Sequence, residues 1–133
     1  MRIVEGTIDD VIGRLDLIRS SIPQKADLTE REVRGRLDGR TYGVVLATDG
    51  ESLQGILVWY EQDRGLYVWL GAVTLRRQGI ATSLFEAVRD STTYARWTVK
   101  TSRCNDAATA HLEKMGFRPY DVRHDTVTYE RLW

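Results

Sequence analysis

The sequence has little cysteine, no excess of charge of either sign and no long apolar run. Its single cysteine, Cys104, cannot form an internal disulfide, whereas secreted domains of this size are usually rich in cysteine. The 19 basic and 19 acidic side chains give a formal net charge of zero, so the whole chain does not attract nucleic acid or anionic lipid. The longest apolar run in the middle of the chain, residues 56–60, is far shorter than the ~20 residues of a membrane helix.

The composition is that of an ordinary globular protein. The 133 residues are 42% hydrophobic and 29% charged, and this length predicts a single domain, residues 1–133. The first residues lack an apolar signal stretch, and acids follow at Asp9 and Asp10. We therefore expect a soluble protein of the reducing cytoplasm. Because 16 of the 19 basic residues are arginine, a local basic patch could still bind phosphates.

Apolar spacing in the first third of the chain predicts a strand followed by two helices. Residues 2–5 alternate weakly between apolar and polar side chains, as in a short strand. Apolar residues then recur at helical spacing between Thr7 and Pro23. A second helix is expected to begin at Thr29 and to end at Gly39.

The pattern then changes to one typical of strands. Three strands are expected, at residues 41–48, 52–61 and 66–73. The dipeptide Asp49-Gly50 between the first two is a strong hairpin signal, so the three strands should form an antiparallel meander. Residues 53–60 are apolar on both faces, which predicts a central strand that is covered on both sides.

The remaining elements alternate between helix and strand. A helix should follow Gly79, and the later elements are expected at residues 96–101 (strand), 105–115 (helix), 117–122 (strand) and 126–131 (strand). The order is therefore β-α-α-β-β-β-α-β-α-β-β. A strand–helix–strand crossover requires a parallel pair. We therefore predict a mixed α/β fold (α+β), with a mostly antiparallel central sheet and helices on both faces.

The segment Arg76-Arg77-Gln78-Gly79-Ile80-Ala81 stands between a predicted strand and the next helix. The first turn of a helix has backbone N–H groups without internal partners and carries about half a positive charge. Glycine lets an anion approach the backbone closely, and two arginines add bidentate donors. This junction is therefore a candidate pyrophosphate site. The plainer interpretation is a helix start preceded by a solvated arginine pair.

Two motifs resemble those of one family. The segment from Arg76 to Ala81 matches the pattern (Arg/Gln)-x-x-Gly-x-(Gly/Ala) of the GNAT superfamily of acetyl-coenzyme A-dependent N-acetyltransferases. Asn105, Ala108 and residues 113–117 (Glu-Lys-Met-Gly-Phe) resemble the second motif of that family. The predicted element order is also that of the GNAT fold, so the resemblance covers essentially the whole chain.

The resemblance implies a binding site for acetyl-CoA, without a metal. The strands that end near Val73 and begin near Trp97 would splay apart and hold the cofactor, with the pantetheine arm paired to the edge of the first. Asn105 would contact the cofactor, although asparagine is also a good N-cap. The residues implied to bind coenzyme A are Ala72, Val73, Arg76, Arg77, Gln78, Gly79, Ile80, Ala81, Thr82 and Asn105.

The sequence departs from the family at the expected general acid. Many members carry a tyrosine on the last helix that protonates the departing thiolate, and Leu112 stands at that position. His111 precedes it, but a rotation of about 100° per residue predicts that the imidazole faces elsewhere. A thiol has a pKa of ~8.5 and leaves tolerably well as a thiolate, so this loss does not exclude activity.

The general base is also not evident. An amine with a pKa of ~10.4 must lose a proton before it attacks. Family members often place an acid on the central strands for this purpose, and the strand before the signature has none. Glu61 is the best carboxylate candidate, acting through water, although an exposed turn carboxylate is the plainer interpretation. Ser102, Tyr67 and His124 are alternative polar groups that the sequence does not rank.

The resemblance implies an N-acetyltransferase that transfers acetyl directly from acetyl-CoA to an amine in a ternary complex. The backbone N–H of Val73 would stabilise the oxyanion. The alternative is a non-catalytic acyl-CoA-binding regulator, motivated by Leu112 and by the missing strand carboxylate. A third interpretation is an unrelated α/β domain whose helix start binds another anion.

The acceptor and the assembly stay open. The resemblance implies an acceptor pocket shaped by residues 20–28 and by the turn at 123–125. Gln24, Lys25 and Asp27 do not converge on one ligand class, so a small amine, an amino acid, an antibiotic and a protein amine are all candidates. A monomer or homodimer is expected, with neither nucleic acid nor a membrane as a partner.

Overall fold

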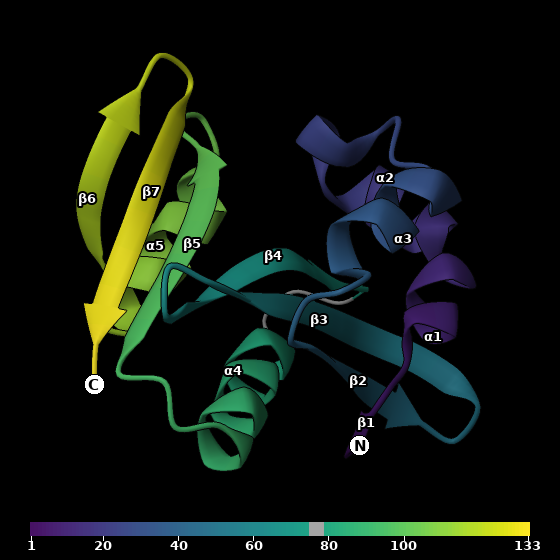
Figure 1. Ribbon diagram of the computed structural model, residues 1–133. Coiled ribbons are helices and arrows are strands. Elements are labelled where there is room, and N and C mark those ends of the chain that lie inside the picture. Colours follow the sequence, from purple (N-terminus) through teal and green to yellow (C-terminus); the bar gives the residue numbers. More distant parts are fainter. Residues whose placement is uncertain (75–78) are drawn as a thin grey trace.

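Seven strands form one mixed sheet. The computed structural model describes residues 1–74 and 79–133. The strands are β1 (Arg2–Glu5), β2 (Tyr42–Asp49), β3 (Ser52–Gln62), β4 (Gly65–Val73), β5 (Arg96–Ser102), β6 (Arg118–Arg123) and β7 (Thr126–Leu132). They are arranged in the order β1-β2-β3-β4-β5-β7-β6 (Figure 1). Only β4 and β5 are parallel neighbours, so the predicted mixed, mostly antiparallel sheet is confirmed.

Helices cover both faces of this sheet, as predicted. The helices are α1 (Ile8–Ile12), α2 (Leu15–Ser21), the 3₁₀ helix η1 (Pro23–Lys25), α3 (Glu30–Leu37), α4 (Ile80–Ser91) and α5 (Asp106–Lys114). The first four gather on one face, called here the α1–α3 face, while α4 and α5 pack on the other, called the α4 face (Figure 1). None of the helices in the described part of the chain is long and apolar enough to cross a membrane.

The helix expected between Thr7 and Pro23 is divided in two. The first piece ends at Gly13, whose backbone N–H donates to the carbonyl of Asp9 at 2.9 Å, and α2 begins two residues later. Glycine inside a helix costs about 1 kcal/mol relative to alanine. Val11 of α1 and Ile18 of α2 are both fully buried in the core of the α1–α3 face.

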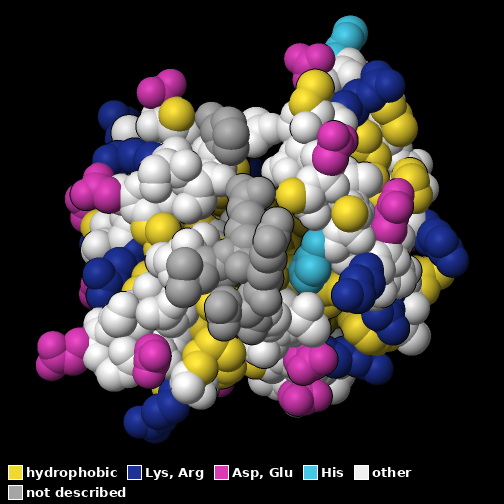
Figure 2. All heavy atoms as spheres, turned by 180° about the vertical axis from the view of Figure 1, so that it is seen from behind, with side chains coloured by type: hydrophobic (Ala, Val, Ile, Leu, Met, Phe, Trp, Pro, Cys, Tyr) yellow, Lys and Arg dark blue, Asp and Glu magenta, His cyan; other side chains and the backbone are white. Residues whose placement is uncertain are grey.

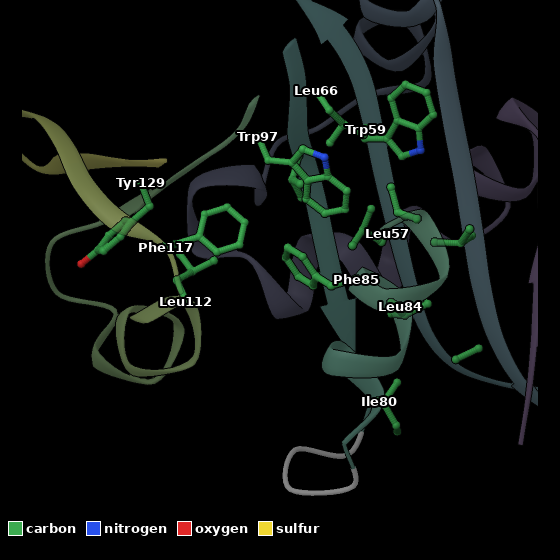
Figure 3. Close-up of a cluster of buried hydrophobic side chains, with 14 of the residues drawn as sticks. Leu57, Trp59, Leu66, Ile80, Leu84, Phe85, Trp97, Leu112, Phe117 and Tyr129 are labelled. Atoms are coloured by element: carbon green, nitrogen blue, oxygen red, sulfur yellow. The ribbon is translucent and has the colours of Figure 1, made fainter. Parts of the chain in front are cut away.

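Strand β3 lies between two hydrophobic cores, which confirms that it is covered on both sides. Ile56, Val58 and Tyr60 join the core of the α1–α3 face, while Leu57 and Trp59 join that of the α4 face. In the second core, Phe85 of α4 lies between the rings of Trp97 and Phe117, with centroids 6.2 and 6.0 Å away (Figure 3).

Gly55 of β3 allows the start of α4 to approach the sheet closely. A Cβ atom at Gly55 would lie only 2.9 Å from Cγ2 of Ile80 and 3.2 Å from Cδ1 of Leu84. Both side chains belong to the first turns of α4 (Figure 3). The absence of a side chain in β3 therefore sets how near the N-terminus of α4 comes to β4.

Candidate functional site

A bulge in β4 separates this strand from β5. Val58 pairs with Leu70, but the next residue of β3, Trp59, pairs with Val68, so Trp69 is an extra residue in β4. The parallel pairing of β4 with β5 ends at Val68 and Val99. A bulge bends its strand and strengthens the local twist. Beyond it, residues 69–73 have β3 on one side and an open edge on the other, which confirms the predicted separation of the strands.

The open edge of β4 presents backbone groups. The backbone N–H of Thr74 donates to the carbonyl oxygen of Gln54 at 2.9 Å. In an antiparallel ladder, alternate residues direct both backbone groups toward the same neighbour. Ala72 therefore faces β3, whereas the N–H and C=O groups of Gly71 and Val73 face the open edge. An extended ligand placed there could form strand-like hydrogen bonds.

The N-terminus of α4 follows this edge. Gly79 is its N-cap residue, with a φ of +68°, and no side chain among the described residues caps it. The first backbone hydrogen bond recorded for this turn is from Ser83 to the carbonyl of Gly79. The N–H groups of Ile80, Ala81 and Thr82 therefore lack helical partners. The first turn also contains no acidic residue, so nothing in it repels an anion.

A cleft of about 720 Å³ connects these features. Seven of the residues predicted to bind coenzyme A line it: Ala72, Val73, Gly79, Ile80, Ala81, Thr82 and Asn105. The other three, Arg76, Arg77 and Gln78, lie outside the described residues. The structure thus brings together in one cleft every described member of the predicted set.

Asn105 begins the helix on the other side of the cleft. Its Oδ1 atom accepts a hydrogen bond from the backbone N–H of Ala108 at 3.1 Å, so it is an N-cap. Its Nδ2 group forms no hydrogen bond with the described residues, and it can still donate to a ligand. Leu112, seven residues later, is only 4% exposed and belongs to the core of the α4 face.

His111 lines the cleft, contrary to the expectation that it faces elsewhere. Its Nε2 atom forms a hydrogen bond with Oγ1 of Thr82 at 3.1 Å, which joins α5 to α4. Burial lowers the pKa of the imidazole below its ordinary value of 6.5, and the charge of Lys114 lowers it further. The imidazole reaches the cleft because more of α5 than one apolar stripe lines it.

Glu61 is not brought into the cleft. It is exposed at the end of β3, opposite Leu66, and its Oε2 atom accepts a hydrogen bond from the hydroxyl of Tyr94 at 3.1 Å. Tyr94 comes shortly after the last residue of α4, so this carboxylate lies toward the end of α4 remote from Gly79. His124 is exposed in the turn between β6 and β7 and also does not line the cleft, whereas Ser102 and Tyr67 do.

On the α1–α3 face, basic groups lie against an aromatic ring that lines the cleft. Nζ of Lys25 lies 5.8 Å from the ring centroid of Trp69, and the guanidinium of Arg36 lies 5.4 Å from it. Burial raises the pKa of Tyr67 to about 12, with a smaller contribution from Tyr60, so the hydroxyl of Tyr67 stays protonated at neutral pH.

Sequence reasoning did not single out Trp69 or Lys100 as cleft residues. Tyr67 and Trp69 are two residues apart in a strand, and this spacing places them on one face. The same spacing rule places Lys100 on the face opposite to that of the buried Trp97 and the partly buried Val99. The spacing therefore predicts on which face of the sheet each side chain lies. It does not predict the cleft, which depends on where β4 and β5 separate.

No protein-family model matches the sequence, and no curated protein matches it. Solved structures do match. The chain is similar to the ribosomal-protein-S18-alanine N-acetyltransferase from Escherichia coli, with 16% identity and a TM-score of 0.82, over 98% of this chain and 92% of that one. It is also similar to aminoglycoside 6'-acetyltransferase type Ii, with 20% identity and a TM-score of 0.79, over 99% and 97%.

A third similar structure is a GNAT family acetyltransferase from Elizabethkingia anophelis with acetyl-CoA bound. It has 18% identity and a TM-score of 0.77, over 99% of this chain and 97% of that one. The likeness to each of these three extends over nearly the whole chain. The protein therefore has the fold of the GNAT superfamily of acetyltransferases.

Proposed function

We propose that the protein is an N-acetyltransferase that uses acetyl-CoA as its acetyl donor. The observation that carries this proposal is that the open edge of β4 leads to the uncapped N-terminus of α4 within one cleft. A strand edge binds an extended chain that contains amides, and a helix N-terminus binds phosphate. Coenzyme A contains both parts, a pantetheine arm and a pyrophosphate. The fold shared with acetyltransferases supports the same choice.

The groups present fit this donor. In the proposal, the backbone of Ala72 and Val73 borders the pantetheine arm, and the N–H groups of residues 79–82 bind the pyrophosphate. Asn105 offers its free Nδ2 group from the opposite wall. The motif residues Arg76, Arg77 and Gln78 complete the proposed set on the basis of the sequence alone.

The chain contributes position and electrostatics to the reaction. Acetyl-CoA supplies a thioester whose carbonyl carbon accepts the amine and whose thiol has a pKa of ~8.5. Holding two reactants in the correct orientation can supply about 7–11 kcal/mol of a barrier. The backbone N–H of Val73, which faces the open edge, is the proposed donor to the developing oxyanion. No covalent acyl-enzyme is needed.

The described lining of the cleft offers no strong base, because its imidazole, His111, has a lowered pKa and is hydrogen-bonded with Thr82. Among the described residues that line it there is no aspartate or glutamate. The hydroxyl of Tyr67 has its pKa raised to about 12, so it is a donor at neutral pH and accepts no proton. We therefore propose that the proton of the acceptor amine leaves to water and that Glu61 takes no part.

The alternative, a non-catalytic acyl-CoA-binding regulator, is favoured by one observation. Leu112 is buried in the core at the position where many family members carry the acid. One pair of measurements separates the two functions: calorimetric titration with coenzyme A, and release of free thiol from acetyl-CoA with a panel of amines. Binding with amine-dependent thiol release supports the enzyme, and binding with no release supports the regulator. The absence of binding contradicts both.

A further inference from the structure

The cleft gathers positive charge. The sequence contains three lysines, Lys25, Lys100 and Lys114, and all three line the cleft. No acidic residue lies among its described lining residues. On the face of the molecule in Figure 2, acidic and basic side chains are interspersed. The excess of positive charge is therefore a property of the cleft and does not follow from a chain with a net charge of zero.

Two of these lysines lie away from the proposed pyrophosphate site. Ile80, at the start of α4, belongs to the core of the α4 face. Lys25 lies over Trp69, which belongs to the core of the opposite face. In β5, Trp97 and Val99 face the α4 core, so the side chain of Lys100 is directed to the α1–α3 face. Lys25 and Lys100 thus belong to the α1–α3 side of the cleft, whereas the N-terminus of α4 belongs to its α4 side.

The charges on the α1–α3 face act on one another. Burial lowers the pKa of Lys25, and the nearby charges of Arg36 and Lys100 lower it further. Glu32 acts in the opposite direction on this pKa. Its carboxylate accepts a hydrogen bond from Thr29 at the start of α3 and is exposed. Lys25 and Lys100 line this end of the cleft, and with Arg36 they outnumber the one carboxylate that acts on Lys25, which favours an anionic ligand.

We propose that the acceptor is a small amine that also carries an anionic group, a carboxylate or a phosphate, which Lys25 and Lys100 bind. This inference rests on the proposed acetyltransferase function. Lysine and arginine form charge-assisted hydrogen bonds with carboxylates and phosphates. Polycationic amines, such as polyamines and aminoglycosides, would be repelled by the same groups.

The first test compares three amines of equal chain length. 4-Aminobutanoate, butylamine and 1,4-diaminobutane differ in whether the far end is anionic, neutral or cationic. Their binding to the protein saturated with coenzyme A is measured by calorimetry, and their acetylation by thiol release. Glucosamine 6-phosphate and glucosamine form a second pair, which distinguishes phosphate from carboxylate. The proposal predicts that an anionic member binds at least about tenfold more tightly than its neutral and cationic counterparts.

The second test removes the charges. The double variant Lys25→Gln, Lys100→Gln should lose about tenfold in affinity for the preferred anionic amine and little for its neutral counterpart. Its affinity for coenzyme A should stay within about twofold of the wild-type value, because the lysines do not serve the donor. Arg31→Gln, which removes an exposed positive charge from α3, is the matched control and should keep both affinities.

The outcomes separate the two proposals. If coenzyme A itself does not bind, the acetyltransferase proposal fails before any amine is compared. Three outcomes in protein that binds coenzyme A would overturn the acceptor proposal and leave the enzyme proposal standing. These are equal affinities for all the amines, tightest binding of the diamine, or no binding of any anionic amine. A loss of coenzyme A affinity in the double variant would also overturn the acceptor proposal, because the lysines would then serve the donor phosphates.

Discussion

Val68 of β4 and Val99 of β5 form the last parallel pair before the two strands separate. The pair lies directly before the extra residue of the bulge, Trp69. This one extra residue turns both Trp69 and Leu70 toward the α1–α3 core. It also opens the strand edge that borders the cleft. The open edge of β4 and the position of Trp69 on the α1–α3 side of the cleft thus have a common structural cause.

Gly79 should be required for coenzyme A binding. Its φ of +68° places it in the left-handed region, where a residue with a side chain costs about 1–2 kcal/mol. Gly79→Ala should therefore move the first turn of α4 and weaken coenzyme A binding about tenfold, as measured by calorimetry.

Gly50→Ala is the matched control for this variant. Gly50 has a φ of +63° in the hairpin between β2 and β3, and a Cβ atom there would meet nothing within 4 Å. The strain in both variants should lower stability by a similar amount, but only Gly79→Ala should bind coenzyme A less tightly. An unchanged affinity in folded Gly79→Ala protein would refute the role of this helix start.

Gly55 should be required for the close packing of α4 against β3. Gly55→Ala places a Cβ atom 2.9 Å from Ile80 and 3.2 Å from Leu84, and such overpacking costs about 1–3 kcal/mol. The free energy of unfolding in urea should fall by that amount. Gly35→Ala in α3, where a Cβ meets nothing within 4 Å, should leave stability unchanged or raise it by up to about 1 kcal/mol. Equal stability of the two variants would contradict the close approach of α4.

His111 should make stability depend on pH. Its pKa is lowered in the folded protein by burial and by Lys114, so the unfolded chain binds more protons as the pH falls below about 6.5. The free energy of unfolding is therefore unaffected by His111 well above pH 6.5, and it decreases as the pH falls below this value. Urea unfolding at several pH values should show a smaller decrease for His111→Gln than for the wild type. Parallel curves for the two proteins would contradict the burial of this imidazole.

Glu61 should be dispensable for catalysis. Its side chain shares a face with its cross-strand partner Leu66, in the core of the α4 face, and it accepts a hydrogen bond from Tyr94. The acceptor is proposed to enter from the other face of the sheet. Glu61→Gln should keep kcat/KM within about twofold, and it should keep the acidic limb of the pH profile, in which activity rises as a base loses its proton. Loss of a titration limb in this variant would identify Glu61 as the base after all.

The sequence was sufficient for the element order and for most of the proposed donor site. Asp49-Gly50 predicted the first hairpin, and Gly79 followed by amphipathic spacing predicted the start of α4, because turns and helix starts depend on neighbouring residues. The run at residues 53–60, which is apolar on both faces, likewise predicted a strand between two cores, since burial on both faces removes the polar alternation.

The sequence alone predicted neither the bulge in β4 nor the position of Lys25 and Lys100 at one end of the cleft. A single extra residue at Trp69 changes no local pattern, because the bulge exists only relative to the register of β3. Lys25 and Lys100 are 75 positions apart, and only the folded sheet brings them to one end of a cleft. The break at Gly13 was also missed, since one glycine inside a periodic helix is often tolerated.

A crystal structure of the protein with bound coenzyme A tests the central claim most directly. The account predicts that the pantetheine arm hydrogen bonds to the backbone of Gly71 and Val73 along the open edge of β4. It also predicts that the pyrophosphate accepts hydrogen bonds from the N–H groups at the start of α4. A complex in which the cofactor binds elsewhere, or in which this edge stays free at saturating coenzyme A, would contradict it.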